Sequence, residues 1–211
     1  MTASSATEIK DTTGNPAPLG LLAFGMTTVL LNLQNAGWIE FSSMILAMGL
    51  CYGGLAQVIA GIMEWKKNNT FGATAFISYG MFWISLVVLV ALPDAVKGIT
   101  GPSASGMTAY LAIWGVFTAA LFFGTLRLNA ALQVVFATLV ILYFLLALGS
   151  HLGSASLNRI AGIEGIFCGL SAMYTGAAGL LNELFQRTVL PVGPVAIVKA
   201  PVEASPSRAV G

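Results

Sequence analysis

Residues 130–149 read AALQVVFATLVILYFLLALG and contain no charged side chain. A transmembrane α-helix needs about 20 consecutive apolar residues, and this stretch supplies that length without interruption. A strand of a membrane β-barrel would instead alternate apolar and polar residues over about ten positions. Because the stretch is continuously apolar and much longer, it predicts a membrane-spanning helix.

Five similar apolar runs accompany this one, and charged or turn-forming residues separate them. The predicted spans cover residues 19–38, 42–63, 71–92, 110–126, 130–149 and 160–181. Of the 211 residues, 57% are hydrophobic and 8% are charged, whereas a soluble domain carries about 25% charged residues. The composition excludes an ordinary soluble enzyme and predicts an all-α membrane protein with six transmembrane helices.

The six helices form one predicted transmembrane domain over residues 15–191. We expect a disordered leader at 1–14 and a disordered tail at 192–211, because the tail is rich in proline and has no long apolar run. Basic residues collect on the side of the membrane where synthesis occurs. An N-terminus on that side places seven Lys and Arg residues there and leaves two opposite, so both termini are predicted to be cytoplasmic.

The start of the first helix has a defined pattern, Asn15-Pro16-Ala17-Pro18-Leu19-Gly20. Asparagine is a good N-cap residue and proline suits the first helical position, so Asn15 is the predicted cap and Pro16 the first helical residue. Pro18 is tolerated because the first-turn N–H groups have no partner within the helix. The pattern is either a plain helix start or an anion site built from exposed N–H donors.

Uncharged polar residues are placed inside several spans, and four of them form the candidate substrate path: Thr27, Thr28, Asn32 and Gln57. Single groups of this kind often join two helices by a hydrogen bond of about 0.6 kcal/mol. As a set, they favour a water-filled path. Glu164 is the one acid clearly inside a span, and it is either a protonatable functional group or a helix-end acid reaching the headgroups.

Small residues repeat along the sixth span at spacings of 3 and 4: Gly162, Gly165, Gly169, Ala172, Gly176 and Gly179. This seam predicts close approach of a neighbouring helix. The sequence 24–28 also resembles 114–118, 90 residues later, which suggests an inverted repeat of three plus three helices, as in many transporters.

Catalytic and cofactor motifs are missing from the sequence. One His and two Cys residues leave little material for a metal site, and no phosphate-binding glycine loop is present. A net charge of +1 gives no basic surface for nucleic acid. We therefore expect no enzyme activity, no cofactor, no metal and no nucleic-acid partner.

Two of these segments resemble motifs of a known family. Asn-Pro-Ala-Pro-Leu-Gly-Leu-x-Ala-Phe at 15–24 and Tyr-Gly-Met-Phe-Trp at 79–83 are similar to signatures of the acetate uptake transporter family, which includes the bacterial succinate–acetate permeases. The resemblance covers residues 15–191. It implies a homohexamer in the cytoplasmic membrane, with an anion path in each protomer and a hydrophobic constriction of Phe24, Tyr79 and Leu139.

The resulting hypothesis is transport of acetate and related small carboxylates, either channel-like or coupled to protons. Carboxyl groups are mostly ionised at pH 7, and an apolar constriction gates such ions by dewetting. The first alternative is a passive channel for a small neutral solute such as urea or an amide. The second is a membrane protein with a structural role and no transport.

Overall fold

The structure is a computed structural model that describes residues 13–194. Its helices are α1 (Ala17–Asn35), α2 (Ser43–Met48), the π-helix η1 (Gly49–Ala56), α3 (Gln57–Lys66), α4 (Thr70–Ala95), α5 (Ala104–Thr125), α6 (Ala130–Leu152) and α7 (Ala155–Phe185). Together α2, η1 and α3 make one span. The described residues thus contain six helical segments long and apolar enough to cross a membrane, which confirms the predicted fold class.

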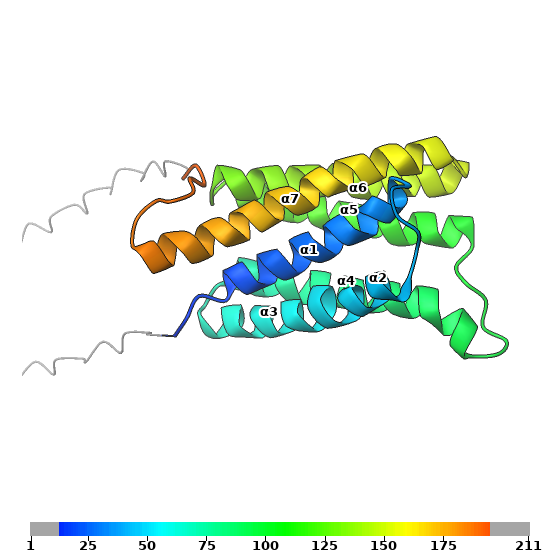
Figure 1. The fold of residues 1–211 in the computed structure, drawn as a ribbon, viewed down its shortest axis with the longest axis horizontal. Coiled ribbons are helices and arrows are strands. Elements are labelled where there is room, and N and C mark those ends of the chain that lie inside the picture. The colour runs from blue at the N-terminus through cyan, green and yellow to red at the C-terminus, as the bar shows by residue number, and fades with distance from the viewer. Residues whose placement is uncertain (1–12, 195–211) are drawn as a thin grey trace, which may run out of the picture.

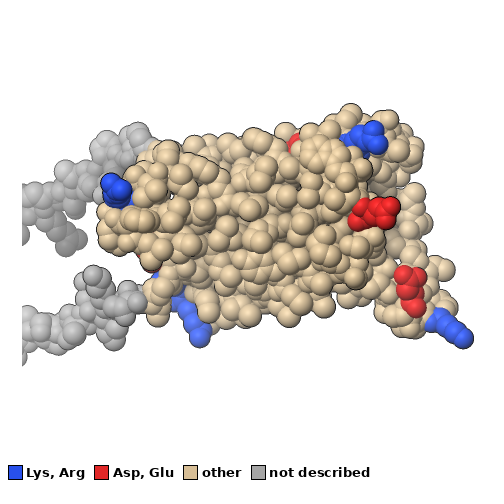
Figure 2. Space-filling view, in the orientation of Figure 1, with Lys and Arg blue, Asp and Glu red and all other residues tan. Residues whose placement is uncertain are grey.

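The six spans lie side by side in one bundle, and both ends of the described chain lie at the same end of it (Figure 1). On the face shown in Figure 2, charged side chains gather mainly toward the two ends and leave a broad uncharged zone between them. Large apolar side chains are exposed on the helices, among them Ile113, Phe123 and Phe167. Such a surface suits a lipid solvent.

Several helices extend beyond the predicted apolar runs because polar residues cap them. The side chains of Asn69, Ser103, Asn129 and Ser154 each accept a hydrogen bond from a backbone N–H in the first turn of the helix that follows. These caps start α5 at Ala104 and α7 at Ala155, whereas the apolar runs begin at 110 and 160. Hydropathy marks the hydrocarbon zone, and capping marks the helix ends.

The first helix departs from the predicted start and end by small amounts. Pro16, and not Asn15, occupies the cap position, and Pro18 lies in the first turn. The Asn15 Oδ1 instead accepts a hydrogen bond from the Ala17 N–H, two residues later, at 3.1 Å. The capping side chains of the later helices accept from the N–H three residues later. The helix ends at Asn35 and not at Trp38, because Gly37 takes a left-handed φ of 76° that closes the last turn.

The predicted glycine seam of the last helix packs against α1. A Cβ atom built on Gly169 would lie 2.8 Å from the Gly25 carbonyl oxygen, and one on Gly25 would lie 2.7 Å from the Gly169 carbonyl oxygen. Gly165 makes room for the Asn32 side chain, and Gly162 for the backbone at Asn35 and Ala36. The two backbones therefore touch directly, as small residues allow.

The π-helix η1 interrupts the second span, which we expected to be a regular helix. It contains Gly49, Gly53 and Gly54, all buried. Gly53 lies between the side chains of Thr27 and Trp83. Short π-helical segments occur often at functional sites, and here the first α-helical residue after the segment is Gln57.

Residues 186–194, after α7, return to the start of α6 at the end of the bundle where both ends of the described chain lie. The Asn182 Oδ1 accepts hydrogen bonds from the Val189 and Leu190 N–H groups, at 2.7 and 2.9 Å. The carbonyls of Val192 and Gly193 then accept from the first two N–H groups of α6, at 3.0 and 2.8 Å. The described start of the predicted disordered tail is thus anchored, whereas residues 1–12 and 195–211 lie outside the described part.

Candidate functional site

A cavity of about 350 Å³ lies between α1, α3, α4 and α6. Its volume falls at the lower end of the range for small-molecule sites, about 300–1,000 Å³. The cavity opens at the end of the bundle that holds both described termini. At its mouth lie Glu64, Asn69, Arg127 and Asn129, and its walls farther in are mostly apolar.

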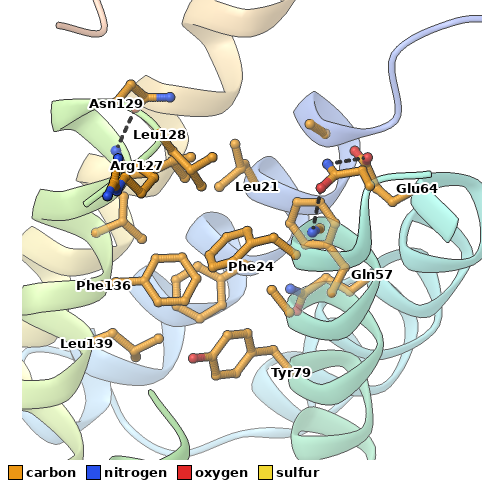
Figure 3. A pocket seen from close by; sticks show the side chains of 18 residues that line it. Leu21, Phe24, Gln57, Glu64, Tyr79, Arg127, Leu128, Asn129, Phe136 and Leu139 are labelled. Atoms are coloured by element: carbon orange, nitrogen blue, oxygen red, sulfur yellow. Dashed lines mark hydrogen bonds between the residues drawn. The ribbon is translucent and has the colours of Figure 1, made fainter. Parts of the chain in front are cut away.

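At the inner end of this cavity the structure brings together Phe24, Tyr79 and Leu139, the three residues expected to form a constriction (Figure 3). They come from α1, α4 and α6, and each is at most 5% exposed. The rings of Phe24 and Tyr79 have centroids 5.8 Å apart. Phe136, which our sequence analysis missed, adds a fourth side chain with its ring centroid 6.1 Å from that of Tyr79.

The Tyr79 ring is held in place through its hydroxyl group. This hydroxyl donates a hydrogen bond to the Thr118 Oγ1 at 3.0 Å, and the Thr118 hydroxyl donates to the Trp114 carbonyl at 2.7 Å. Because its polar tip is occupied in this way, Tyr79 offers mainly its aromatic surface to the cavity. The inner end of the cavity is therefore apolar despite the tyrosine.

Gln57 is the polar side chain in the deeper wall of the cavity. It is 1% exposed, and neither its Oε1 nor its Nε2 has a hydrogen-bond partner in the part of the chain that the structure describes. Leaving a buried polar group unpaired costs about 1–3 kcal/mol. Because the unpaired Gln57 amide lines the cavity, it can bind a polar molecule there.

The other three predicted path residues are buried but do not line this cavity. The Thr27 hydroxyl donates to the Met48 carbonyl at 3.4 Å. The Asn32 Nδ2 donates to the Thr28 carbonyl at 2.9 Å, and its Oδ1 accepts from Asn35. Thr28 differs, since its buried Oγ1 lacks a partner among the described residues.

A second cavity of about 160 Å³ lies nearer the opposite end of the bundle. It shares no lining residue with the first. On α1 the first cavity includes Phe24 and the second Leu31, and on α6 the corresponding residues are Leu139 and Leu146. Seven helical residues span ~10 Å, which is the separation along α1 and α6, whereas on α4 Tyr79 of the first cavity and Phe82 of the second are three residues apart. Thr28 lies in α1 between Phe24 and Leu31.

The remaining predicted positions have other surroundings. Gly20 is buried, and a Cβ there would meet the Phe76 ring at 2.6 Å, so this glycine lets α4 approach α1. The α1 start contributes Ala17 to the cavity wall. Glu164 is partly buried in α7 with both carboxylate oxygens unpartnered among the described residues, but it lines none of the cavities described above.

Sequence reasoning missed the residues at the cavity mouth. Glu64 and Arg127 end apolar runs, so they were assigned only to the membrane boundary. Asn129 caps α6, and Asn69 caps α4. Their cap positions were available as a signal, but which caps would border one cavity depends on how the helices pack.

Comparison with known proteins connects this geometry to a family. The sequence profile of the GPR1/FUN34/yaaH family matches residues 1–196. The chain belongs to the GPR1/FUN34/yaaH family. The resemblance deduced from the motifs at 15–24 and 79–83 is thereby confirmed.

Several relatives of this chain are transporters or channels by name. The succinate-acetate/proton symporter SatP of Escherichia coli K12 is 52% identical over 180 residues, which cover 85% of this chain and 95% of SatP. Acetate permease A of Emericella nidulans is 32% identical over 194 residues, covering 84% of this chain and 65% of the permease. The structure of the bacterial acetate channel SatP matches with a TM-score of 0.84 at 50% identity, over 86% of this chain and all of that chain.

Proposed function

We propose that this protein moves acetate and other small carboxylates, including succinate, across the cytoplasmic membrane. The observation that carries the proposal is the cavity that extends from a charged mouth to the apolar layer of Phe24, Tyr79 and Leu139. The relatives named for acetate and succinate support it. The family resemblance further favours a homohexamer with one path in each protomer.

The path binds its anion weakly, which suits transport. No Lys or Arg lies in the deeper walls of the cavity, so the donor available there is the Gln57 amide. Conduction needs binding that is favourable enough for entry and weak enough for release. Beyond the apolar layer, the unpartnered Thr28 hydroxyl is the next polar group, whereas Thr27 and Asn32 serve mainly in helix contacts.

Uptake of radiolabelled acetate into proteoliposomes tests the function directly. The expected result is acetate flux above that of protein-free liposomes, and more of it when a proton gradient is imposed. Flux of urea without flux of acetate would establish the neutral-solute channel instead. Absence of flux for every solute would leave a structural membrane protein.

Leu139→Ala is expected to broaden the substrate range. Shortening this buried side chain widens the apolar layer, so larger monocarboxylates should gain on acetate by about tenfold, the lower end of what one or two methylene groups change in an apolar pocket. Competition of benzoate and lactate with labelled acetate measures the change. Leu142→Ala is the matched control, because Leu142 is equally buried on α6 but does not line the cavity. Unchanged selectivity in Leu139→Ala would remove Leu139 from the constriction.

A further inference from the structure

Glu64 is a buried carboxylate at the cavity mouth. It is 3% exposed and lies seven residues after Gln57 in α3, so the two side chains share one face of the helix. Its Oε2 accepts a hydrogen bond from the Asn69 Nδ2 at 2.7 Å, and the Asn69 Oδ1 accepts from the Gly72 N–H at 3.0 Å. Its Oε1 has no partner within residues 13–194.

Charged and titratable groups around Glu64 are few. Lys67 lies one turn later and acts on the carboxylate through space, and its own Nζ donates to the Thr13 carbonyl at 2.8 Å. Arg127 lies on the opposite wall of the cavity (Figure 3). Of the helices packed on α3, α1 has no ionisable side chain, η1 has only Cys51 and Tyr52, and α4 adds Tyr79 and the distant Asp94.

A negative charge at this place opposes the entry of an anion. An ionised carboxylate is costly to bury unless its oxygens are paired, and Glu64 lines a cavity that is proposed as the path of other carboxylates. Protonation of Glu64 removes the charge that repels the anion and is costly to bury. The hydroxyl of the protonated side chain also donates a hydrogen bond to an anion in the cavity. Hydrogen bonds between a carboxylic acid and a carboxylate are short and strong.

We propose that Glu64 exchanges a proton with the transported carboxylate at the cavity mouth, an inference that rests on the proposed function. A proton from the adjacent water binds the Glu64 Oε1. The O–H bond then breaks as a new O–H bond forms on the bound carboxylate, which leaves a neutral carboxylic acid and an ionised Glu64. In the opposite direction, an arriving acid gives its proton to Glu64, leaves as the anion, and Glu64 releases the proton to water.

Proton exchange at the cavity mouth is consistent with the apolar layer that lies farther along the path. Carboxyl groups have similar proton affinities, so the transfer in either direction is easy. The neutral acid then meets the apolar layer of Phe24, Tyr79 and Leu139 without the desolvation cost of a charge. Glu164, the acid singled out in the sequence, borders neither this cavity nor the one beyond the layer, so it has no comparable access to the solute.

Proton movement coupled to acetate tests the role of Glu64. An acetate gradient is applied to proteoliposomes containing a pH-sensitive dye, and rates are corrected for protein-free liposomes. Glu64→Gln keeps the shape and a partner for Asn69 but cannot carry a proton, so acetate-driven acidification is expected to fall at least tenfold, a modest part of the 10²–10⁴ that a positioned proton donor contributes. Glu64→Asp should restore much of the rate.

Two further variants separate this role from a structural one. Glu164→Gln removes the other buried carboxylate and should leave coupling unchanged. Asn69→Ala removes the hydrogen bond to Glu64 but keeps the proton carrier, so it should retain coupling while lowering thermal stability. Acetate flux with coupling intact in Glu64→Gln would overturn the inference alone. No acetate flux from the wild-type protein would overturn the proposed function and this inference with it.

Discussion

Gly169→Leu is expected to leave little folded protein. The α1 and α7 backbones touch here, and even a Cβ would meet the Gly25 carbonyl oxygen at 2.8 Å and the Val29 backbone nitrogen at 2.9 Å. Backbone atoms cannot move aside as a side chain can, so α1 and α7 must separate along the seam. Overpacking in a protein interior costs about 1–3 kcal/mol for added methylenes, and a clash with backbone should exceed that range.

The yield of monodisperse protein in detergent and its unfolding temperature measure the effect. Gly169→Ala should show a weaker form of the same defect. Gly179→Ala is the control on the same seam, because a Cβ there meets only the Pro18 side chain at 3.3 Å. Helix propensity favours alanine over glycine by about 1 kcal/mol, so this control should be as stable as the wild-type protein or more so. Equal behaviour of the two alanine variants would contradict the proposed tightness at Gly169.

Gln57→Leu is expected to slow transport at least about tenfold while making the fold more stable than before. Its two unpartnered polar atoms cost stability in the folded protein, and replacing them with an apolar group of similar size relieves a penalty of about 1–3 kcal/mol. The solute, however, loses the hydrogen-bonding group that replaces water in the deeper cavity. A loss of about 1.4 kcal/mol of stabilisation for the passing solute corresponds to tenfold in rate.

This prediction is specific because Gln57→Leu should raise the stability of the fold while it lowers the acetate flux. Acetate uptake in proteoliposomes and unfolding temperature in detergent are measured on the same preparations. Thr125→Val provides the control, since Thr125 is also fully buried, donates to the Phe122 carbonyl and does not line the cavity. This control should lose stability and keep its flux. A Gln57→Leu protein that transports acetate at the wild-type rate would show that the amide does not contact the solute.

Much of this protein is determined by properties that are local in sequence. Continuous apolar runs specify six spans, because the bilayer requires about 20 residues for each and every backbone polar group must be paired inside the helix. The repeat of small residues from Gly162 to Gly179 predicts a close helix contact. The motifs around Phe24 and Tyr79 identify the family, and the resemblance implies the three proposed constriction residues, Phe24, Tyr79 and Leu139. The inverted repeat and the side on which the termini lie stay predictions.

Tertiary structure decides which polar groups line the cavity that is proposed as the path. Thr28, Asn32 and Gln57 look alike in sequence, since each is an uncharged polar residue inside a span. In the packed structure the Asn32 side chain contacts α7 at Gly165, whereas Gln57 lies without a partner in a cavity wall. Gln57 directly follows the π-helix η1, which hydropathy cannot reveal. In the sequence Glu64 is a membrane-boundary residue, whereas the structure buries it at the cavity mouth beside Asn69, the cap of α4. The physical reason is that hydropathy reports the depth of a residue in the membrane, whereas the rotation of each helix determines whether its side chain faces lipid, a neighbour or the path.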